Sequence, residues 1–183
     1  MKPVSASCGR GIKIVDTKQT VSQKEGILAS RYLMSPHLIN GLKYDLRVYV
    51  LVTSYSPLKV YVYNDGLVRF ATEPYTVDPK TVNQKFVHLT NFSINKKNTK
   101  FVKNNDKSDS DENEQDSSKW DFKQLDAAFT KSGNDLKAVF REVNDIIVKT
   151  LISVEREINL NVQKNPNTRN NCFELYGFDV IID

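Results

Sequence analysis

The stretch KYDLRVYVLVT, residues 43–53, decides the fold. Successive side chains of a β-strand point to opposite faces, so this alternation predicts a half-buried strand. Its apolar face would consist of Leu46, Val48, Val50 and Val52. Its other face would carry Lys43, Asp45 and Arg47, and unpaired charges are costly to bury. These three groups must therefore reach water, one another or a ligand, and either an ion-pair cluster or a nucleotide site explains them.

Other signals lie on both sides of this strand. The apolar runs 60–63 and 67–71 flank Asn64, Asp65 and Gly66, which predict a hairpin turn because glycine tolerates positive φ. The remaining expectations are a short strand at 12–15, a turn or flap at 17–26, a polar loop at 161–171 and a final apolar strand at 173–182.

Two helices are expected in the second half of the sequence. The first runs from about Lys119 to Lys131, with Gly133 near its end. The second starts near Asn134 or Asp135 and has an apolar stripe at helical spacing, which predicts a side that faces the core. The stripe consists of Leu136, Val139, Phe140, Val143, Ile147, Leu151 and Val154.

The composition is that of a globular domain, or of part of a larger one. The 183 residues are 39% hydrophobic and 26% charged, with a net charge of +4. Lys and Arg are spread without a dense run, so we expect no nucleic-acid partner, and the apolar runs are too short for a membrane span. Cys8 and Cys172 fit neither a metal site nor a disulfide framework, which favours a reduced, intracellular compartment. Residues 104–118 are polar and acidic and predict a disordered insertion.

The stretch KPVSASCGRGI, residues 2–12, has the chemistry of a phosphate-binding loop. Gly9 and Gly11 would let backbone N–H groups approach an anion, and Lys2 and Arg10 would add positive charge. The stretch is not a Walker A motif, because its lysine precedes the glycines. Taken alone, these residues are more often a glycine-containing turn with solvated charges.

Several single residues also allow both a structural and a functional interpretation. Arg69 is either a solvated arginine on an edge strand or a ligand contact. His88, which precedes the polar residues Thr90 and Asn91, is either a buried, hydrogen-bonded histidine or a catalytic one. Asp179 and Asp183 would share one face of the last strand and suit Mg²⁺, which prefers oxygen ligands, although Asp183 also fits a turn.

The order of these features resembles the ATP-grasp arrangement, and the sequence resembles the tubulin–tyrosine ligase and ligase-like family, most closely its polyglutamylases. The matching stretches are KPVSASCGRGI (2–12), RYLMSPHLINGLKYDLRVYVLVTSYSPLKVYVYNDGLVRFATEPY (31–75), KFVHLTNFSINK (85–96) and CFELYGFDVIID (172–183). The resemblance implies an α+β fold over residues 1–183. It would be a partial ATP-grasp fold with portions of the central and C-terminal lobes, truncated at both ends.

The resemblance also implies an ATP site. The glycine loop would close over the phosphates, residues 31–33 would line the adenine pocket, and the charged strand would face the base and the ribose. The implied ATP-binding residues are Lys2, Ser7, Gly9, Arg10, Gly11, Arg31, Tyr32, Leu33, Lys43, Asp45, Thr90 and Asn91. Ser30 stands where many family members carry glutamine, which is a departure at the adenine pocket.

Three cations and one carboxylate would take part in the chemistry by the same resemblance. Arg47 and Arg69 would hold the transferred phosphoryl group and the amino-acid substrate, and Lys96 would lie close to that amino acid. Asp179 would be the first magnesium ligand. Family members have an N-terminal lobe and a later Glu-Val-Asn strand with further metal ligands, so we expect these 183 residues alone to be inactive.

The implied reaction is ATP-dependent amide formation through an acyl phosphate. It would add free glutamate to glutamate side chains in the acidic C-terminal tail of tubulin. Tubulin and microtubules would be the partners, and the location would be the cytoplasm and the microtubule cytoskeleton, including the cilium or basal body. Residues 53–58 and 65–71 look most like glutamylases. The alternatives are glycine or tyrosine addition, or a non-catalytic module that binds nucleotide or microtubules.

Overall fold

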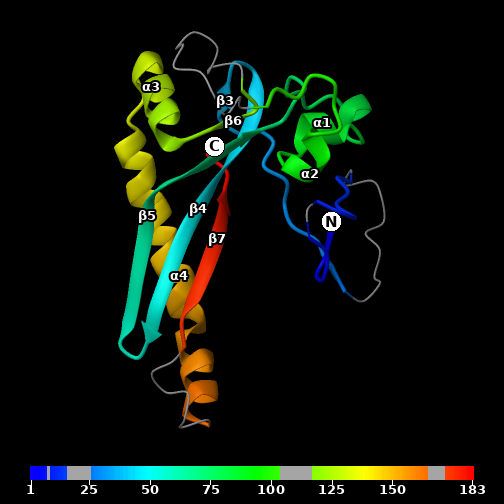
Figure 1. Cartoon of the computed structure of the whole chain (residues 1–183). Helices are drawn as coiled ribbons and strands as arrows, with labels where there is room; N and C mark the ends of the chain where they lie inside the picture. Colours follow the sequence, from blue (N-terminus) through cyan, green and yellow to red (C-terminus); the bar gives the residue numbers. More distant parts are fainter. Residues whose placement is uncertain (8, 16–25, 104–116, 165–171) are drawn as a thin grey trace. The chain divides into compact units, whose positions relative to one another are not determined.

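The computed structural model describes residues 1–7, 9–15, 26–103, 117–164 and 172–183 (Figure 1). The elements are β1 (Lys2–Pro3), β2 (Ile27–Leu28), β3 (Leu38–Ile39), β4 (Leu42–Tyr55), β5 (Leu58–Phe70), the 3₁₀ helix η1 (Pro79–Thr81), α1 (Lys85–His88), α2 (Phe92–Asn95), β6 (Lys119–Trp120), α3 (Phe122–Ser132), α4 (Leu136–Gln163) and β7 (Glu174–Val180). This mixture of helices with antiparallel strands confirms the predicted α+β class.

The chain forms two compact units. Unit 1 consists of Met1–Asp45, Arg69–Trp120 and Ile181–Asp183, and unit 2 consists of Leu46–Val68 and Asp121–Val180. The long strands β4 and β5 run through both units, so each unit receives one part of the charged strand that decided the fold.

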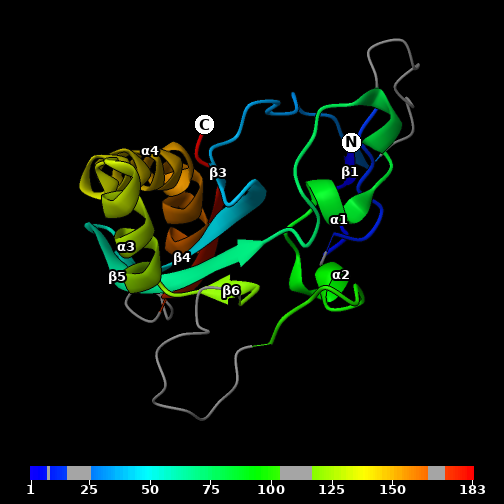
Figure 2. The same ribbon diagram turned by 90° about the horizontal axis from the view of Figure 1, so that it is seen from above.

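Unit 2 is a sheet covered by helices on one face. Strand β7 runs antiparallel to β4 in register from Leu46 opposite Val180 to Val52 opposite Glu174. Figures 1 and 2 show α3 and α4 on one side of β4, β5 and β7. The core residues are Leu46, Val48, Val50, Val52, Val68, Phe122, Leu125, Phe129, Leu136, Val143, Ile147 and Leu151. The predicted apolar face of residues 43–53 is confirmed, because all four of its side chains have no exposed surface.

The predicted end of α3 and the predicted start of α4 are confirmed, but the predicted start of α3 at Lys119 is wrong, because Lys119 and Trp120 form strand β6 and α3 begins at Phe122. Asp121 and Gln124 form a capping box at the start of α3, and such a cap contributes about 1 kcal/mol. Gly133 ends α3 in the left-handed conformation at φ 75°, and Asp135 caps α4. The predicted stripe on α4 is right up to Leu151 but wrong at Val154, whose side chain is 41% exposed.

The hairpin predicted at Asn64, Asp65 and Gly66 is wrong. Strand β5 runs straight through these residues, and the chain reverses instead between Tyr55 and Leu58. Gly66 is required by close packing and not by turn geometry. A Cβ atom there would lie 2.4 Å from the carbonyl oxygen of Arg47 and 2.5 Å from Cζ of Phe122.

A hairpin that the sequence analysis missed joins β3 to β4 in unit 1. Asn40 and Gly41 both have positive φ, 50° and 75°, and the flanking pairs are Ile39 opposite Leu42 and Leu38 opposite Lys43. Asn-Gly is the preferred pair for a two-residue turn of this kind. This turn sets the register in which Lys43 enters β4.

Other predicted segments need small corrections. Residues 12–15 are not a strand; the first strand is β1 at Lys2–Pro3, which pairs with β2. Residues 161–163 extend α4, and β7 is shorter than predicted, so Asp183 lies outside it. Ser118 hydrogen-bonds to Val102 and Phe70, so the end of the predicted insertion is folded. Cys8 and the ranges 16–25, 104–116 and 165–171 lie outside the described residues. None of the helices in the described part of the chain has the length and apolar character that crossing a membrane requires.

Candidate functional site

Unit 1 buries the ammonium group of Lys43 among aromatic rings. Lys43 is 4% exposed, and its Nζ donates to the hydroxyl of Tyr32 at 3.1 Å. The same Nζ lies 4.5 Å from the centroid of the Tyr32 ring and 5.9 Å from that of Tyr75. Burial lowers the pKa of Lys43, and the nearby charge of Asp45 opposes this shift.

A histidine extends this cluster. His88 is 5% exposed, with Nδ1 2.9 Å from the Tyr32 hydroxyl and Nε2 3.0 Å from the carbonyl oxygen of Thr81. Burial lowers the pKa of His88, which keeps the ring neutral, and burial raises the pKa of Tyr32, which keeps the phenol protonated. A neutral ring satisfies both contacts when Nε2–H donates to Thr81 and Nδ1 accepts from Tyr32. The polar groups around Lys43 are thus held in fixed positions.

Asp45 and Arg69 form a buried ion pair in unit 1. Asp45 is 5% exposed and Arg69 is 9% exposed. Arg69 donates through Nε to one carboxylate oxygen at 2.9 Å and through Nη2 to the other, so the pair is bidentate. A bidentate arginine–carboxylate pair fixes the planes of the guanidinium and the carboxylate relative to each other. The pair fixes Arg69 on β5 relative to Asp45 on β4, which excludes the first of the two alternatives for Arg69, an edge-strand arginine in solvent.

The glycine loop lies against α2. Gly9 is buried at φ 74°, and a Cβ atom there would lie 2.7 Å from Oδ1 of Asn91 and 2.5 Å from Cδ1 of Ile94. Asn95 is 1% exposed and donates from Nδ2 to the carbonyl oxygens of Asn91 and Leu89. Two predicted ATP-binding residues, Gly9 and Asn91, are therefore neighbours, and Asn95 holds the backbone at one of them.

In unit 2, Arg47 pairs with Asp179 across β4 and β7. Arg47 Nε donates to Oδ1 of Asp179 at 2.7 Å, and Nη2 donates to Oδ2 at 3.3 Å. A Cβ atom at Gly177 would lie 2.9 Å from Nη1 of Arg47, so the guanidinium lies over a residue without a side chain. The side chains are 31% and 49% exposed, which leaves this pair accessible from solvent.

The remaining predicted residues are less enclosed. Lys2 is exposed on β1, and Arg10 is exposed with a long contact of 3.5 Å from Nη2 to the hydroxyl of Ser7. Lys96 lies at the C-terminal end of α2 with its Nζ 5.4 Å from the centroid of the Phe92 ring. Four further predicted ATP-binding residues make no described contact that bears on a site: Gly11, Arg31, Leu33 and Thr90.

Three positioning groups, His88, Asn95 and Tyr75, are not among the residues predicted for the site. His88 carries two predicted alternatives, and its buried, hydrogen-bonded alternative is confirmed. His88 and Asn95 lie in the motif HLTNFSIN at 88–95. A run in which polar residues interrupt apolar ones without helical or strand periodicity signals a segment held by side-chain hydrogen bonds.

The described residues do not enclose a metal ion by themselves. No group of three or more His, Cys, Asp and Glu side chains within these residues is placed to hold one. Magnesium commonly takes only one or two protein carboxylates and completes its shell with phosphate oxygens and water. A single carboxylate such as Asp179 is therefore compatible with Mg²⁺ but does not define a site.

Comparison with known proteins gives relatives that match the chain from end to end. It is 43% identical over 183 residues to tubulin polyglutamylase TTLL5 of Homo sapiens. It is 38% identical over 183 residues to tubulin monoglutamylase TTLL4 of Mus musculus, and 34% identical over 190 residues to tubulin polyglutamylase TTLL7 of Xenopus tropicalis. Each alignment covers the whole of this chain. It covers only 14%, 15% and 20% of the length of these three relatives, respectively.

The chain thus spans between about a seventh and a fifth of the length of these relatives. The sequence model of the tubulin-tyrosine ligase family matches residues 1–183, the whole of the chain. The chain belongs to the tubulin-tyrosine ligase family.

Proposed function

We propose that this chain is the part of an ATP-dependent ligase that adds glutamate to glutamate side chains of tubulin. Family membership over residues 1–183 and relatives named as tubulin polyglutamylases and a monoglutamylase support the reaction class. The structural observation that carries the proposal is the buried ammonium group of Lys43. It has no ion-pair partner within 4.0 Å among the described residues, and its one described hydrogen bond, to the Tyr32 hydroxyl, leaves two of its three N–H donors for a ligand.

The residues of unit 1 fit a nucleotide. The ammonium group of Lys43 supplies donors beside the rings of Tyr32 and Tyr75, which suits a purine and its polar edge. Asp45 keeps lone pairs for a ribose hydroxyl while it holds Arg69. The backbone at Gly9, Arg10 and Gly11 would receive the phosphates, with Lys2 and Ser7 beside it and Thr90 and Asn91 opposite. Arg31 and Leu33 would contact the adenine through their backbone.

The residues of unit 2 fit a metal–phosphate group. Asp179 would be a carboxylate ligand of Mg²⁺, and Arg47 would neutralise charge on the phosphoryl oxygens. Both are accessible and adjacent. Arg69 and Lys96 in unit 1 would bind the carboxylates of the incoming amino acid, for which a planar guanidinium and a mobile ammonium are suited.

The proposed chemistry is acyl activation. A carboxylate is a poor acylating agent, and ATP supplies the phosphoryl group that converts it to an acyl phosphate. ADP leaves in this transfer, and the amine of free glutamate then attacks the acyl carbon, so that the amide bond forms and inorganic phosphate and a proton are released. The protein's own groups would act by positioning and by electrostatic stabilisation, because none of them needs to form a covalent bond.

A transfer assay tests the proposal. The protein that contains this chain is incubated with ATP, tubulin and labelled glutamate, glycine or tyrosine in parallel. We expect only glutamate to be incorporated, and only with ATP and Mg²⁺. The Lys43→Met variant should lower incorporation at least about 100-fold, the scale of losing a preorganised charged contact. Preferred incorporation of glycine or tyrosine would overturn the choice of amino acid, and ATP binding without any incorporation would favour a non-catalytic module.

The proposed partner sets the proposed location. An enzyme that modifies tubulin works in the cytoplasm and on the microtubule cytoskeleton, and we extend this to the cilium and basal body, where microtubules are concentrated. Imaging of the tagged protein together with tubulin tests both parts of the statement.

A further inference from the structure

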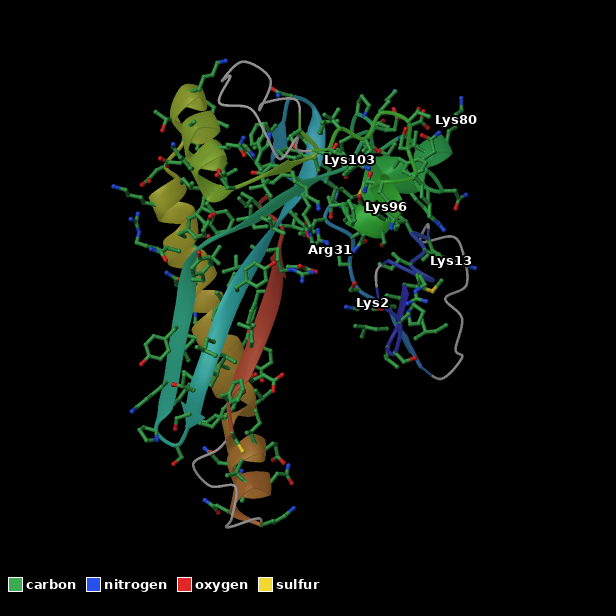
Figure 3. The ribbon with its side chains drawn as sticks, in the orientation of Figure 1. Lys2, Lys13, Arg31, Lys80, Lys96 and Lys103 are labelled. Atoms are coloured by element: carbon green, nitrogen blue, oxygen red, sulfur yellow. The ribbon has the colours of Figure 1, made fainter. Side chains whose placement is uncertain are left out.

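Among the described residues, the excess of positive over negative charge lies in unit 1. The described residues of unit 1 include thirteen Lys and Arg against four Asp and Glu, whereas those of unit 2 include nine against ten. Figure 3 labels six of the unit 1 cations: Lys2, Lys13, Arg31, Lys80, Lys96 and Lys103. A surface with one sign of charge attracts ligands of the opposite sign and speeds their association. Unit 1 is thus the part of the chain that an acidic partner would approach.

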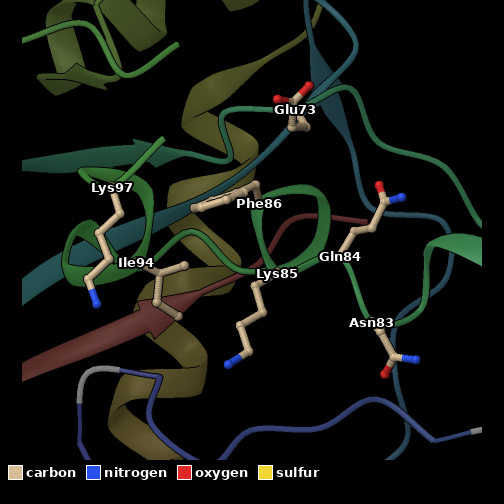
Figure 4. A pocket seen from close by; sticks show the side chains of 7 residues that line it. All are labelled: Glu73, Asn83, Gln84, Lys85, Phe86, Ile94 and Lys97. Carbon is tan, nitrogen blue, oxygen red and sulfur yellow. The ribbon is translucent and has the colours of Figure 1, made fainter. Parts of the chain in front are cut away.

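A pocket of about 550 Å³ opens on this unit beside α1 and α2. We call it the α1–α2 pocket. It is lined by Glu73, Asn83, Gln84, Lys85, Phe86, Ile94 and Lys97. In Figure 4 the side chains of Lys85 and Lys97 extend to the same side, with Ile94 between them, and Glu73 lies apart from them.

The charges that line the α1–α2 pocket are not balanced. Glu73, its one described carboxylate, accepts from Lys100 at 2.6 Å and from Asn98 at 3.1 Å, and these bonds lower the pKa of Glu73. The ammonium groups of Lys85 and Lys97 have no ion-pair partner within 4.0 Å in the described ranges. The amides of Asn83 and Gln84 add further donors, and Phe86 and Ile94 add apolar surface. The pocket therefore suits an anion that carries a short apolar stem.

The α1–α2 pocket borders the glycine loop. Ile94 lines the pocket, and its Cδ1 is the atom that a Cβ at Gly9 would approach to 2.5 Å. A ligand in the pocket would thus lie next to the segment proposed to hold the ATP phosphates. This position differs from that of Lys43, Asp45 and Arg69, none of which lines the pocket.

We propose that the α1–α2 pocket binds a glutamate side chain of the acidic polypeptide that is to be modified. The inference rests on the proposed function, which it deepens by naming a subsite for the acceptor. The carboxylate would lie between the ammonium groups of Lys85 and Lys97, and its methylene groups would pack on Phe86 and Ile94. A lysine binds an anion as a mobile point charge, which suits a polypeptide whose successive carboxylates differ in position.

Binding of a short fluorescent glutamate peptide to the chain tests the proposal. The pocket variant combines Lys85→Gln and Lys97→Gln. The control variant combines Lys123→Gln and Lys137→Gln, which removes two exposed lysines of unit 2 without a described ion pair. We expect the pocket variant to bind about tenfold more weakly and with a shallower salt dependence, and the control variant to bind like the unaltered chain. Thermal unfolding of both variants verifies that they fold.

Two results would overturn the assignment. One is equal affinity of the pocket and control variants for the peptide. The other is displacement of the peptide by inorganic phosphate at the same concentration, since the pocket would then be a general anion site. The transfer assay on the unaltered protein stands apart from both. Loss of transfer with intact peptide binding counts against the proposed function, whereas equal peptide binding by both variants counts against the pocket alone.

Discussion

Two ion pairs that begin on neighbouring positions of β4 differ in their surroundings. Asp45 and Arg69, in unit 1, have side chains that are only 7% and 11% exposed, whereas Arg47 and Asp179, in unit 2, are 31% and 49% exposed. A buried pair must have its hydrogen bonds satisfied, because a charge left alone in the interior is costly. An exposed pair contributes little to stability. The first pair thus holds Arg69 in a fixed orientation within unit 1, while the second pair is open to solvent.

The same contrast holds for the interiors of the units. Every buried polar or charged side chain among the described residues belongs to unit 1: Lys43, Asp45, Arg69, Thr72, His88, Asn95 and Ser118. Unit 2 buries aliphatic and aromatic side chains under α3 and α4. Contacts between apolar side chains depend little on the direction in which the side chains point, whereas a hydrogen bond fixes the orientation of its donor and acceptor groups. Unit 2 is therefore suited to be a scaffold and unit 1 to hold polar groups in defined positions.

The largest effect is expected from Arg69→Ala. The substitution leaves the carboxylate of Asp45 buried without its partner, so the free energy of unfolding should fall by about 3–5 kcal/mol. Denaturant titration measures the loss. Replacing both residues together, with Asp45→Leu and Arg69→Met, should recover much of it. A loss of less than about 1 kcal/mol for Arg69→Ala would contradict the structural role, since that is the range of an exposed pair.

Gly66→Ala should have a smaller effect, and it tests the apolar packing of unit 2. The new methyl group would meet a backbone oxygen at 2.4 Å and the ring of Phe122 at 2.5 Å, so a loss of about 1–3 kcal/mol is expected. Gly133→Ala is the matched control, because nothing lies within 4 Å of its position. At φ 75° it should lose only about 1 kcal/mol through backbone strain. Equal losses for the two variants would show that Gly66 is not tightly packed.

The sequence predicted unit 2 better than unit 1, and the reason is physical. Alternation on β4 and the stripe on α4 are periodic, because each apolar side chain must reach one core. Gly66 was misread because glycine serves both turns and close packing, and a single sequence does not separate these uses. The pair Asn40–Gly41 carried a stronger turn signal that was not used.

The candidate site was harder to predict than the fold. Lys43 and Asp45 stood out because charges interrupt an apolar strand, but their partners come from elsewhere in the sequence. Arg69 is 24 residues from Asp45, and Tyr32 is 56 residues from His88. Periodicity carries no information on such contacts. The roles given to Lys96 and Arg31 came from family resemblance and remain predictions.

A pH titration tests the polar interior of unit 1. The folded state lowers the pKa of His88 below its ordinary value of about 6.5, so the unfolded chain takes up this proton first as the pH falls. Stability should therefore be full above about pH 6.5 and decline below it, by at most about 1.4 kcal/mol per pH unit, until the folded pKa is reached. Thermal unfolding between about pH 7 and 5 measures the slope, since most carboxylates titrate lower. His88→Gln should remove this contribution, and an unchanged slope in that variant would assign it to other groups.

Arg47→Gln should have the smallest effect on stability. The substitution removes the charge that faces Asp179 and leaves a shorter, neutral side chain, and both partners of the pair are accessible to water. The free energy of unfolding should change by no more than about 1 kcal/mol, and the change should shrink at high salt, which screens exposed charges. Denaturant titration at low and high ionic strength measures both. A loss as large as that of Arg69→Ala would mean that this pair stabilises unit 2, and it would remove the physical reason for assigning Arg47 and Asp179 to phosphate and metal binding.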